Sequence, residues 1–115
     1  MKGCLIMAKR TLEILTESMF YVLMSFMGKE MCGIEIAEFV ERKTKGRVRL
    51  GPGTLYTILG KFEEEHFIEE IQVEGRKRTY RITEKGIQAY RDEVTRLRMC
   101  IADAESEGYL LIKRL

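Results

Sequence analysis

The sequence around Pro52 constrains the fold more than any other stretch of this 115-residue chain. Proline fixes its φ angle and lacks an amide hydrogen, so it suits the first position of a helix. The apolar residues that follow have the i, i+3, i+4, i+7 spacing of one helix face. They are Leu55, Ile58, Leu59 and Phe62. Because burial of each such side chain contributes roughly 1.5–3 kcal/mol at most, we predict a helix that begins near Pro52 and packs this face inward.

The opposite face of the predicted helix suits a nucleic-acid groove. It consists of Thr54, Tyr56, Thr57, Gly60 and Lys61, none of which is acidic. Gly60 has no side chain that would hold a partner away. The helix N-terminus, at Gly53 and Thr54, offers unpaired amide hydrogens to an anion such as a phosphate.

Charges of one sign are grouped along the chain. Among the Lys, Arg, Asp and Glu residues, all six between positions 42 and 61 are basic, and all six between 62 and 74 are acidic. Between 75 and 85 five are basic and one is acidic, although the net charge of the chain is only +2. Two basic segments of this kind can converge into a phosphate-binding surface. The alternative is a set of solvated surface charges.

Composition indicates one small domain without a cofactor. The chain is 45% hydrophobic and 33% charged, which allows a small core that leans on a partner chain. Cys4, Cys32 and Cys100 are scattered, which indicates neither a disulfide framework nor a zinc site. His66 is the single histidine, and the carboxylates at 63–65 are adjacent rather than convergent. We therefore expect no metal, no cofactor and no enzyme activity.

The sequence also predicts a protein outside membranes. No apolar run reaches the roughly 18–20 residues that span a bilayer. The first ten residues are interrupted by Lys9 and Arg10 too early for a secretory signal. We expect a soluble cytoplasmic protein.

Two further helices are predicted before Pro52. The first begins after Thr16 as N-cap and ends at Gly28, with an apolar stripe at Leu15, Met19, Val22, Leu23 and Phe26. Its other side is apolar too, so we expect a partner chain to cover it, the alternative being burial within one chain. The second runs from Cys32 to Gly46. The connection from 46 to 51 carries Arg47 and Arg49, and the two helices around it have the layout of a helix-turn-helix.

A β-hairpin is predicted after the acidic run. Apolar and polar residues alternate over 70–74 and again over 79–83, and Gly75 can take the positive φ of a hairpin turn. The tip then presents Arg76, Lys77 and Arg78. Three successive cations repel one another, which favours a polyanion opposite them; the alternative is a solubilising loop.

The last predicted helix is capped by Thr83 and ends at Gly108, before an apolar tail at 109–112. Its apolar residues form a heptad seam, namely Ile87, Tyr90, Val94, Leu97, Ile101 and Ala104. A seam of this kind predicts a homodimer, in which the first helix contributes Met19, Val22, Leu23 and Phe26. The alternative is that the seam folds back on the first helix of its own chain.

The motifs at 15–23, 31–36, 51–56, 59–65 and 75–86 resemble the PadR family of bacterial transcriptional regulators. The most specific are Pro52-Gly53-Thr54-Leu55-Tyr56 and Tyr80-Arg81-Ile82-Thr83-Glu84-Lys85-Gly86. The resemblance implies a mainly α fold with a small β-hairpin: a winged helix-turn-helix over residues 1–83 and a C-terminal dimerisation helix over 84–115. It also implies a repressor that binds a palindromic operator as a homodimer. We further expect that an unknown effector, for which a small molecule is one candidate, releases it from DNA.

By resemblance, the recognition helix carries Gly53, Thr54, Tyr56, Thr57 and Lys61, and the wing carries Arg76, Lys77 and Arg78. Cys32 and Ile34 replace the usual His and Tyr of the family, and the chain has no Trp with which to form the drug pocket of some relatives.

The residue types suggest a division of roles in double-stranded DNA. Hydroxyl side chains suit base edges, whereas cations, among them Arg47 and Arg49, suit phosphates. We hypothesise that an effector shifts the first helix against the last. The alternative function is a winged-helix module that binds DNA without sequence preference or docks a protein.

Overall fold

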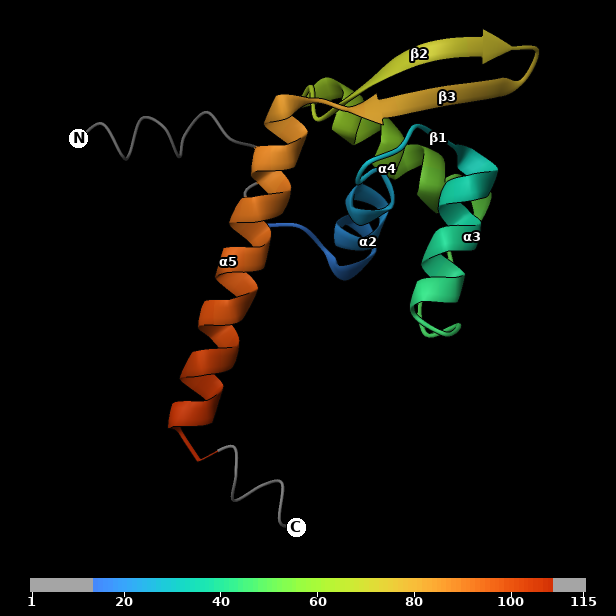
Figure 1. Cartoon of the computed structure of the whole chain (residues 1–115). Helices are drawn as coiled ribbons and strands as arrows, with labels where there is room; N and C mark the ends of the chain where they lie inside the picture. The colour runs from blue at the N-terminus through green and yellow to red at the C-terminus, as the bar shows by residue number, and fades with distance from the viewer. Residues whose placement is uncertain (1–13, 109–115) are drawn as a thin grey trace.

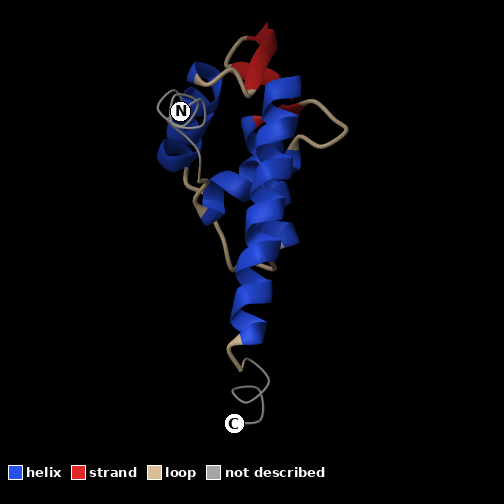
Figure 2. Ribbon diagram, turned by 90° about the vertical axis from the view of Figure 1, so that its left-hand side faces the viewer, coloured by secondary structure: helices blue, strands red, loops and turns tan. Residues whose placement is uncertain are grey.

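The computed structural model describes residues 14–108; the expectations for the first ten residues and for the tail at 109–112 lie outside them. In chain order the elements are α2 (Glu17–Ser25), β1 (Met31–Cys32), α3 (Gly33–Lys43), α4 (Pro52–Glu64), β2 (Ile68–Glu74), β3 (Lys77–Ile82) and α5 (Glu84–Ser106). Helices α2, α3 and α4 group together, and the β2–β3 hairpin lies along one end of the group (Figure 1). The C-terminal half of α5 extends beyond the other helices (Figures 1 and 2). None of the described helices is both long and apolar enough to cross a membrane.

The predicted helix starts are confirmed. The hydroxyl of Thr16 accepts a hydrogen bond from the amide of Met19 at 3.2 Å, and the hydroxyl of Thr83 accepts one from Gly86 at 3.1 Å. Pro52 occupies the first turn of α4, after Gly51 as N-cap. These caps satisfy amides that a helix leaves unpaired at its N-terminus, so short local patterns were sufficient to predict them.

The sheet has one strand more than the predicted hairpin. Its order is β1-β3-β2, all antiparallel, and β1 pairs Met31 with Tyr80. A strand of two residues is too short to show an alternating pattern, so the sequence did not reveal it. A β-bulge between Glu70 and Gln72 interrupts the predicted alternation in β2, and Val73 is consequently 52% exposed. Gly75, with φ +61°, forms the hairpin turn.

The core lies between the helix group and the sheet. Its largest fully buried side chains are Phe26, Phe62, Phe67, Leu23, Ile36 and Leu59. Leu55, Ile58, Leu59 and Phe62 are each 6% exposed or less, which confirms the predicted inward face of α4. That face fixes α4 to the core and leaves its opposite face at the surface.

The structure corrects the predicted dimer residues of the first helix. Met19, Val22, Leu23 and Phe26 are at most 6% exposed because the chain's own core encloses them, so they offer no surface to a second subunit.

The other side of α2 packs against α5, where the ring of Phe20 stacks on Tyr90 with centroids 5.2 Å apart. The N-terminal part of the seam therefore does fold onto its own first helix, whereas Ile101 and Ala104 remain exposed. The division of the chain at residue 84 stays a prediction.

Candidate nucleic-acid interface

The outward face of α4 is fully at the surface. Gly53, Thr54, Tyr56, Thr57, Gly60 and Lys61 are all exposed, and Tyr56 is 56% exposed. The hydroxyl of Thr57 donates to the carbonyl of Gly53 at 2.9 Å, so its oxygen lone pairs are what remains for a partner. The first turn of α4 contains no acidic residue. This face therefore combines hydroxyls, one cation and an unobstructed helix N-terminus.

The structure brings Tyr56 together with the predicted wing. An open hollow of about 520 Å³ lies between α4, the start of α3 and the hairpin tip. Its lining consists of Cys32, Gly33, Ile34, Glu35, Tyr56, Arg76, Lys77 and Arg78. The aromatic hydroxyl and the three cations come from segments twenty residues apart, and the sequence analysis proposed each of them as a DNA contact. Tyr56 fits closely there, because its hydroxyl oxygen lies only 3.4 Å from where a Cβ on Gly33 would be.

The start of α3 is the part of this hollow that the sequence did not assign. Ile34 is 73% exposed, and Glu35 accepts a hydrogen bond from the amide of Cys32 at 2.9 Å. Hydrogen bonds from Cys32 hold the pKa of the Glu35 carboxyl below its usual value, and the nearby charge of Lys77 lowers it further. The capping spacing of Cys32 and Glu35 was a usable signal for the helix start, but not for its position beside Tyr56.

The wing carries cations with and without carboxylate partners. Arg78 pairs with Glu70 at 2.9 Å across the hairpin, and Arg81 pairs with Glu69 at 2.6 Å. Within residues 14–108, Arg76 and Lys77 form no ion pair. These two cations at the tip are therefore the ones best placed to pair with an external anion.

A second open hollow, of about 650 Å³, lies at the N-terminal end of α4. It is lined by Thr16, Ser18 and Met19 from α2 and by Gly53, Thr54, Thr57, Ile58 and Lys61. The other α4 residues that the sequence proposed as DNA contacts, Gly53, Thr54, Thr57 and Lys61, thus lie beside the start of α2. No sequence pattern links these segments, because their proximity results from packing of the two helices on a common core.

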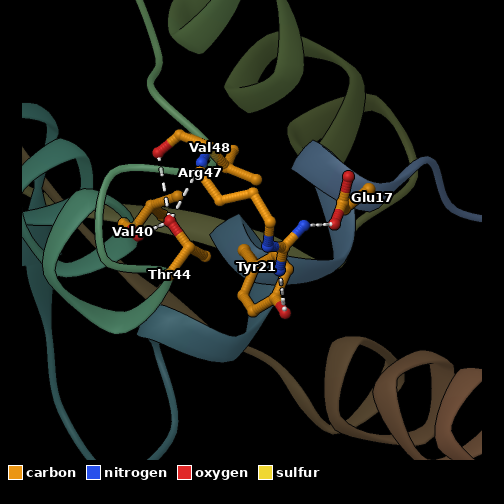
Figure 3. A network of polar contacts seen from close by, with 6 residues as sticks. All are labelled: Glu17, Tyr21, Val40, Thr44, Arg47 and Val48. Atoms are coloured by element: carbon orange, nitrogen blue, oxygen red, sulfur yellow. Dashed lines mark hydrogen bonds and ion pairs between the residues drawn. The ribbon is translucent and has the colours of Figure 1, made fainter.

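The arginines of the α3–α4 connection lie away from Tyr56 and the wing. The guanidinium of Arg47 donates to the carboxylate of Glu17 and, at 3.1 Å, to the hydroxyl of Tyr21 (Figure 3). Its pKa is raised, chiefly by the hydrogen bond to Glu17. Arg49 lies 3.8 Å from a carboxylate oxygen of Glu41. Neither arginine lines the hollow that joins Tyr56 to the wing, in contrast to the grouping that the sequence predicted.

Comparison with known proteins matches this arrangement to one family. The model of the transcriptional regulator PadR-like family matches residues 22–92, which is more than half of the chain. No curated protein sequence matches significantly.

Three solved structures illustrate the shared winged-helix fold. A transcriptional regulator from Clostridium thermocellum has a TM-score of 0.70 at 21% identity, over 81% of this chain and 97% of that one. A PadR family transcription regulator from Clostridium difficile has 0.68 at 17% identity, over 79% and 97%. Bacillus subtilis PadR, in complex with operator DNA, has 0.59 at 21% identity, over 66% and 45%. With the family model covering most of the winged-helix region, the chain belongs to the PadR-like family of transcriptional regulators.

Proposed function

We propose that this protein is a repressor that binds a palindromic operator as a homodimer. The observation that carries the proposal is the hollow in which Tyr56 of α4 lies beside Arg76, Lys77 and Arg78 of the wing. A hydroxyl-bearing aromatic ring can contact base edges, and cations beside it can bind the neighbouring phosphates. The complex of Bacillus subtilis PadR with operator DNA supports the same use of a similar fold.

The exposed residues of α4 would make two kinds of contact with DNA. Tyr56, Thr54 and Thr57 face base edges or sugars, whereas Lys61 and the free N-terminal amides at Gly53 face phosphates. Arg76 and Lys77 add phosphate contacts from the wing. Arg49 lies outside the hollow beside Tyr56, but its side chain is largely exposed and is kept in the proposal as a further phosphate contact.

Homodimerisation is supported by the part of the seam that the chain itself leaves uncovered. Val94 and Leu97 are half-buried, Ile101 is 58% exposed, and this half of α5 extends away from the helix group (Figure 2). A second copy of α5 would cover these side chains by heptad packing. A two-fold dimer would then read half-sites about 34–36 Å apart, or a multiple of that distance.

Shortening Ile101 to alanine tests this seam. We expect the dimer dissociation constant to rise about tenfold, because each of the two subunits loses roughly one buried methylene's worth of contact at ~0.8 kcal/mol. Met99→Ala is the matched control, since Met99 is 63% exposed but lies off the seam, and it should change the constant by less than about twofold. Sedimentation equilibrium measures both. Equal effects of the two variants, or a wild-type chain that stays monomeric, would contradict the proposed interface.

Replacing Arg76 by glutamine tests the wing. We expect weaker binding to operator and random duplex alike, with the slope of log affinity against log salt reduced by about 0.9, because one phosphate contact is lost. Arg81→Gln serves as control, since Arg81 is already paired with Glu69, and its slope should stay near that of the wild type. Fluorescence anisotropy titrations at several salt concentrations give the slopes. A wild-type slope for Arg76→Gln would remove the wing from the DNA contacts.

Release by an effector is proposed at a third hollow, of about 340 Å³, between α2 and α5. Its lining is Leu15, Thr16, Glu17, Phe20, Tyr21, Glu93, Arg96 and Leu97. Glu93 is only 3% exposed and is bound by Arg96 at 2.5 Å, so the lining combines a charged pair with the aromatic side chains of Phe20 and Tyr21. A small molecule bound there would press α2 away from α5 and so alter the spacing of the two recognition helices.

Selection from a random duplex library tests the proposed function. A specific regulator should enrich a palindrome with two half-sites one helical turn apart or a multiple of it. Enrichment of no sequence, with binding that falls steeply with salt, would instead establish a DNA-binding module without sequence preference. No binding to duplex at any salt concentration would point to a protein partner.

A further inference from the structure

Arg47 is held by the first helix rather than left open to a ligand. Its guanidinium donates to Glu17 and Tyr21, one turn apart on α2, and lies over the Tyr21 ring at 5.8 Å (Figure 3). Arginine presents several donors in one plane, so it can bind the carboxylate and the phenol together. This contact joins the connection before α4 to a helix thirty residues earlier.

The backbone that carries Arg47 is itself fixed. Thr44 is buried, and its hydroxyl donates to the carbonyl of Val40 at 2.8 Å while it accepts from the amide of Val48 at 3.0 Å (Figure 3). Val48 is also buried, which places one anchor on each side of Arg47. The connection is therefore held on both sides of Arg47. A change in the contact between α2 and Arg47 would consequently shift the start of α4.

We infer that Arg47 is a positioning residue, which sets the approach of α4 to DNA through α2 instead of binding a phosphate. The inference rests on the proposed DNA-binding function and concerns its regulation. Glu17 and Tyr21 also line the hollow between α2 and α5. An occupant of that hollow would touch the same two side chains that hold Arg47, so its effect would reach the recognition helix by a direct route.

The ion pair between Arg47 and Glu17 is exposed to solvent. The Arg47 and Glu17 side chains are 56% and 57% exposed, and exposed ion pairs contribute little to stability. Melting temperatures alone would therefore not separate the two roles of Arg47. The sign of the change in DNA affinity does separate them.

Glu17→Arg is the decisive variant. It removes one negative charge and adds one positive charge, so the net charge rises by two, and a phosphate-binding role for Arg47 predicts equal or tighter operator binding. The positioning role predicts that operator affinity falls by about fivefold, because two arginines now repel each other where the ion pair was. The double variant Glu17→Arg with Arg47→Glu should restore affinity to within about twofold, as expected for an exposed pair whose charges are exchanged. Glu38→Arg makes the same charge change on exposed α3 and should not weaken binding.

Operator titrations on folded variants, checked by circular dichroism, give the result. Lower affinity for Glu17→Arg with rescue in the double variant supports the inference; equal or tighter binding, or failure of the rescue, overturns it. Tyr21→Phe removes only the hydroxyl that Arg47 donates to, so it serves if Glu17→Arg does not fold, and it should lower operator affinity without changing the salt slope. Lack of a preferred operator in the wild type would overturn the proposed function instead.

Discussion

Replacing Gly86 by alanine is expected to lower the free energy of unfolding by about 3 kcal/mol, the upper end for overpacking a core. A Cβ at this position would overlap the carbonyl oxygen of Phe67 and lie 2.7 Å from Cγ1 of Ile82. The Phe67 carbonyl cannot move aside freely, because it also accepts a hydrogen bond from the amide of Thr83 at 2.9 Å. Gly86 thus allows α5 to start directly against the turn between α4 and β2 and against the end of β3.

Gly60→Ala is the control for this prediction. No atom lies within 4 Å of a Cβ at Gly60, and alanine is favoured over glycine inside a helix, so we expect a gain of about 0.5–1 kcal/mol. Urea unfolding at one fixed protein concentration measures both variants, since the proposed dimerisation would make stability depend on concentration. Equal stability of Gly86→Ala and the wild type would mean that α5 does not start in the position described.

Replacing Tyr56 by alanine is expected to weaken operator binding by about 1–3 kcal/mol while leaving binding to random duplex nearly unchanged. The reason is that Tyr56 is 56% exposed in the hollow beside the wing, where it carries no charge that a phosphate would attract. Its loss should therefore relax base preference at one position of each half-site. The stability of the fold should change little, because most of the ring lies outside the core.

Competition titrations with operators changed at single positions measure this effect, and Tyr56→Phe isolates the hydroxyl. If Tyr56 reads a base edge by hydrogen bonding, Tyr56→Phe should reproduce most of the loss. If its ring only packs on sugars or a thymine methyl, the phenylalanine variant should bind like the wild type. A uniform loss across all sequences for Tyr56→Ala would contradict the role in base reading.

Elements with local signals could be predicted from the sequence. The start of α4 follows from the φ angle of Pro52, and the caps at Thr16 and Thr83 follow from the preference of threonine for that position. The inward face of α4 follows from its apolar spacing. Tyr56 and the three wing cations could each be proposed as DNA contacts from the motifs, but their position around one hollow is seen only in the structure.

Features that depend on contacts between distant segments could not be predicted. Two faces of α2 are apolar, and nothing local told which of them the core would enclose; the core encloses Met19 and Val22, while Phe20 packs on α5. The partner of Arg47 is thirty residues away, so its charge alone suggested a phosphate contact. A pattern gives the composition of a surface, whereas tertiary packing decides which surfaces face each other.

Sequence-specific binding by this protein is tested most directly by titrating the DNA upstream of its own gene, at two salt concentrations, with random duplex as competitor. We expect a palindromic site that survives competition and is bound about 10³–10⁷-fold more tightly than random duplex at equal salt. Arg76→Gln should lower the affinity of the protein for every DNA sequence. Tyr56→Ala should reduce its preference for particular bases. If random duplex competes as well as unlabelled upstream DNA, the result would contradict sequence-specific regulation by α4 and the wing.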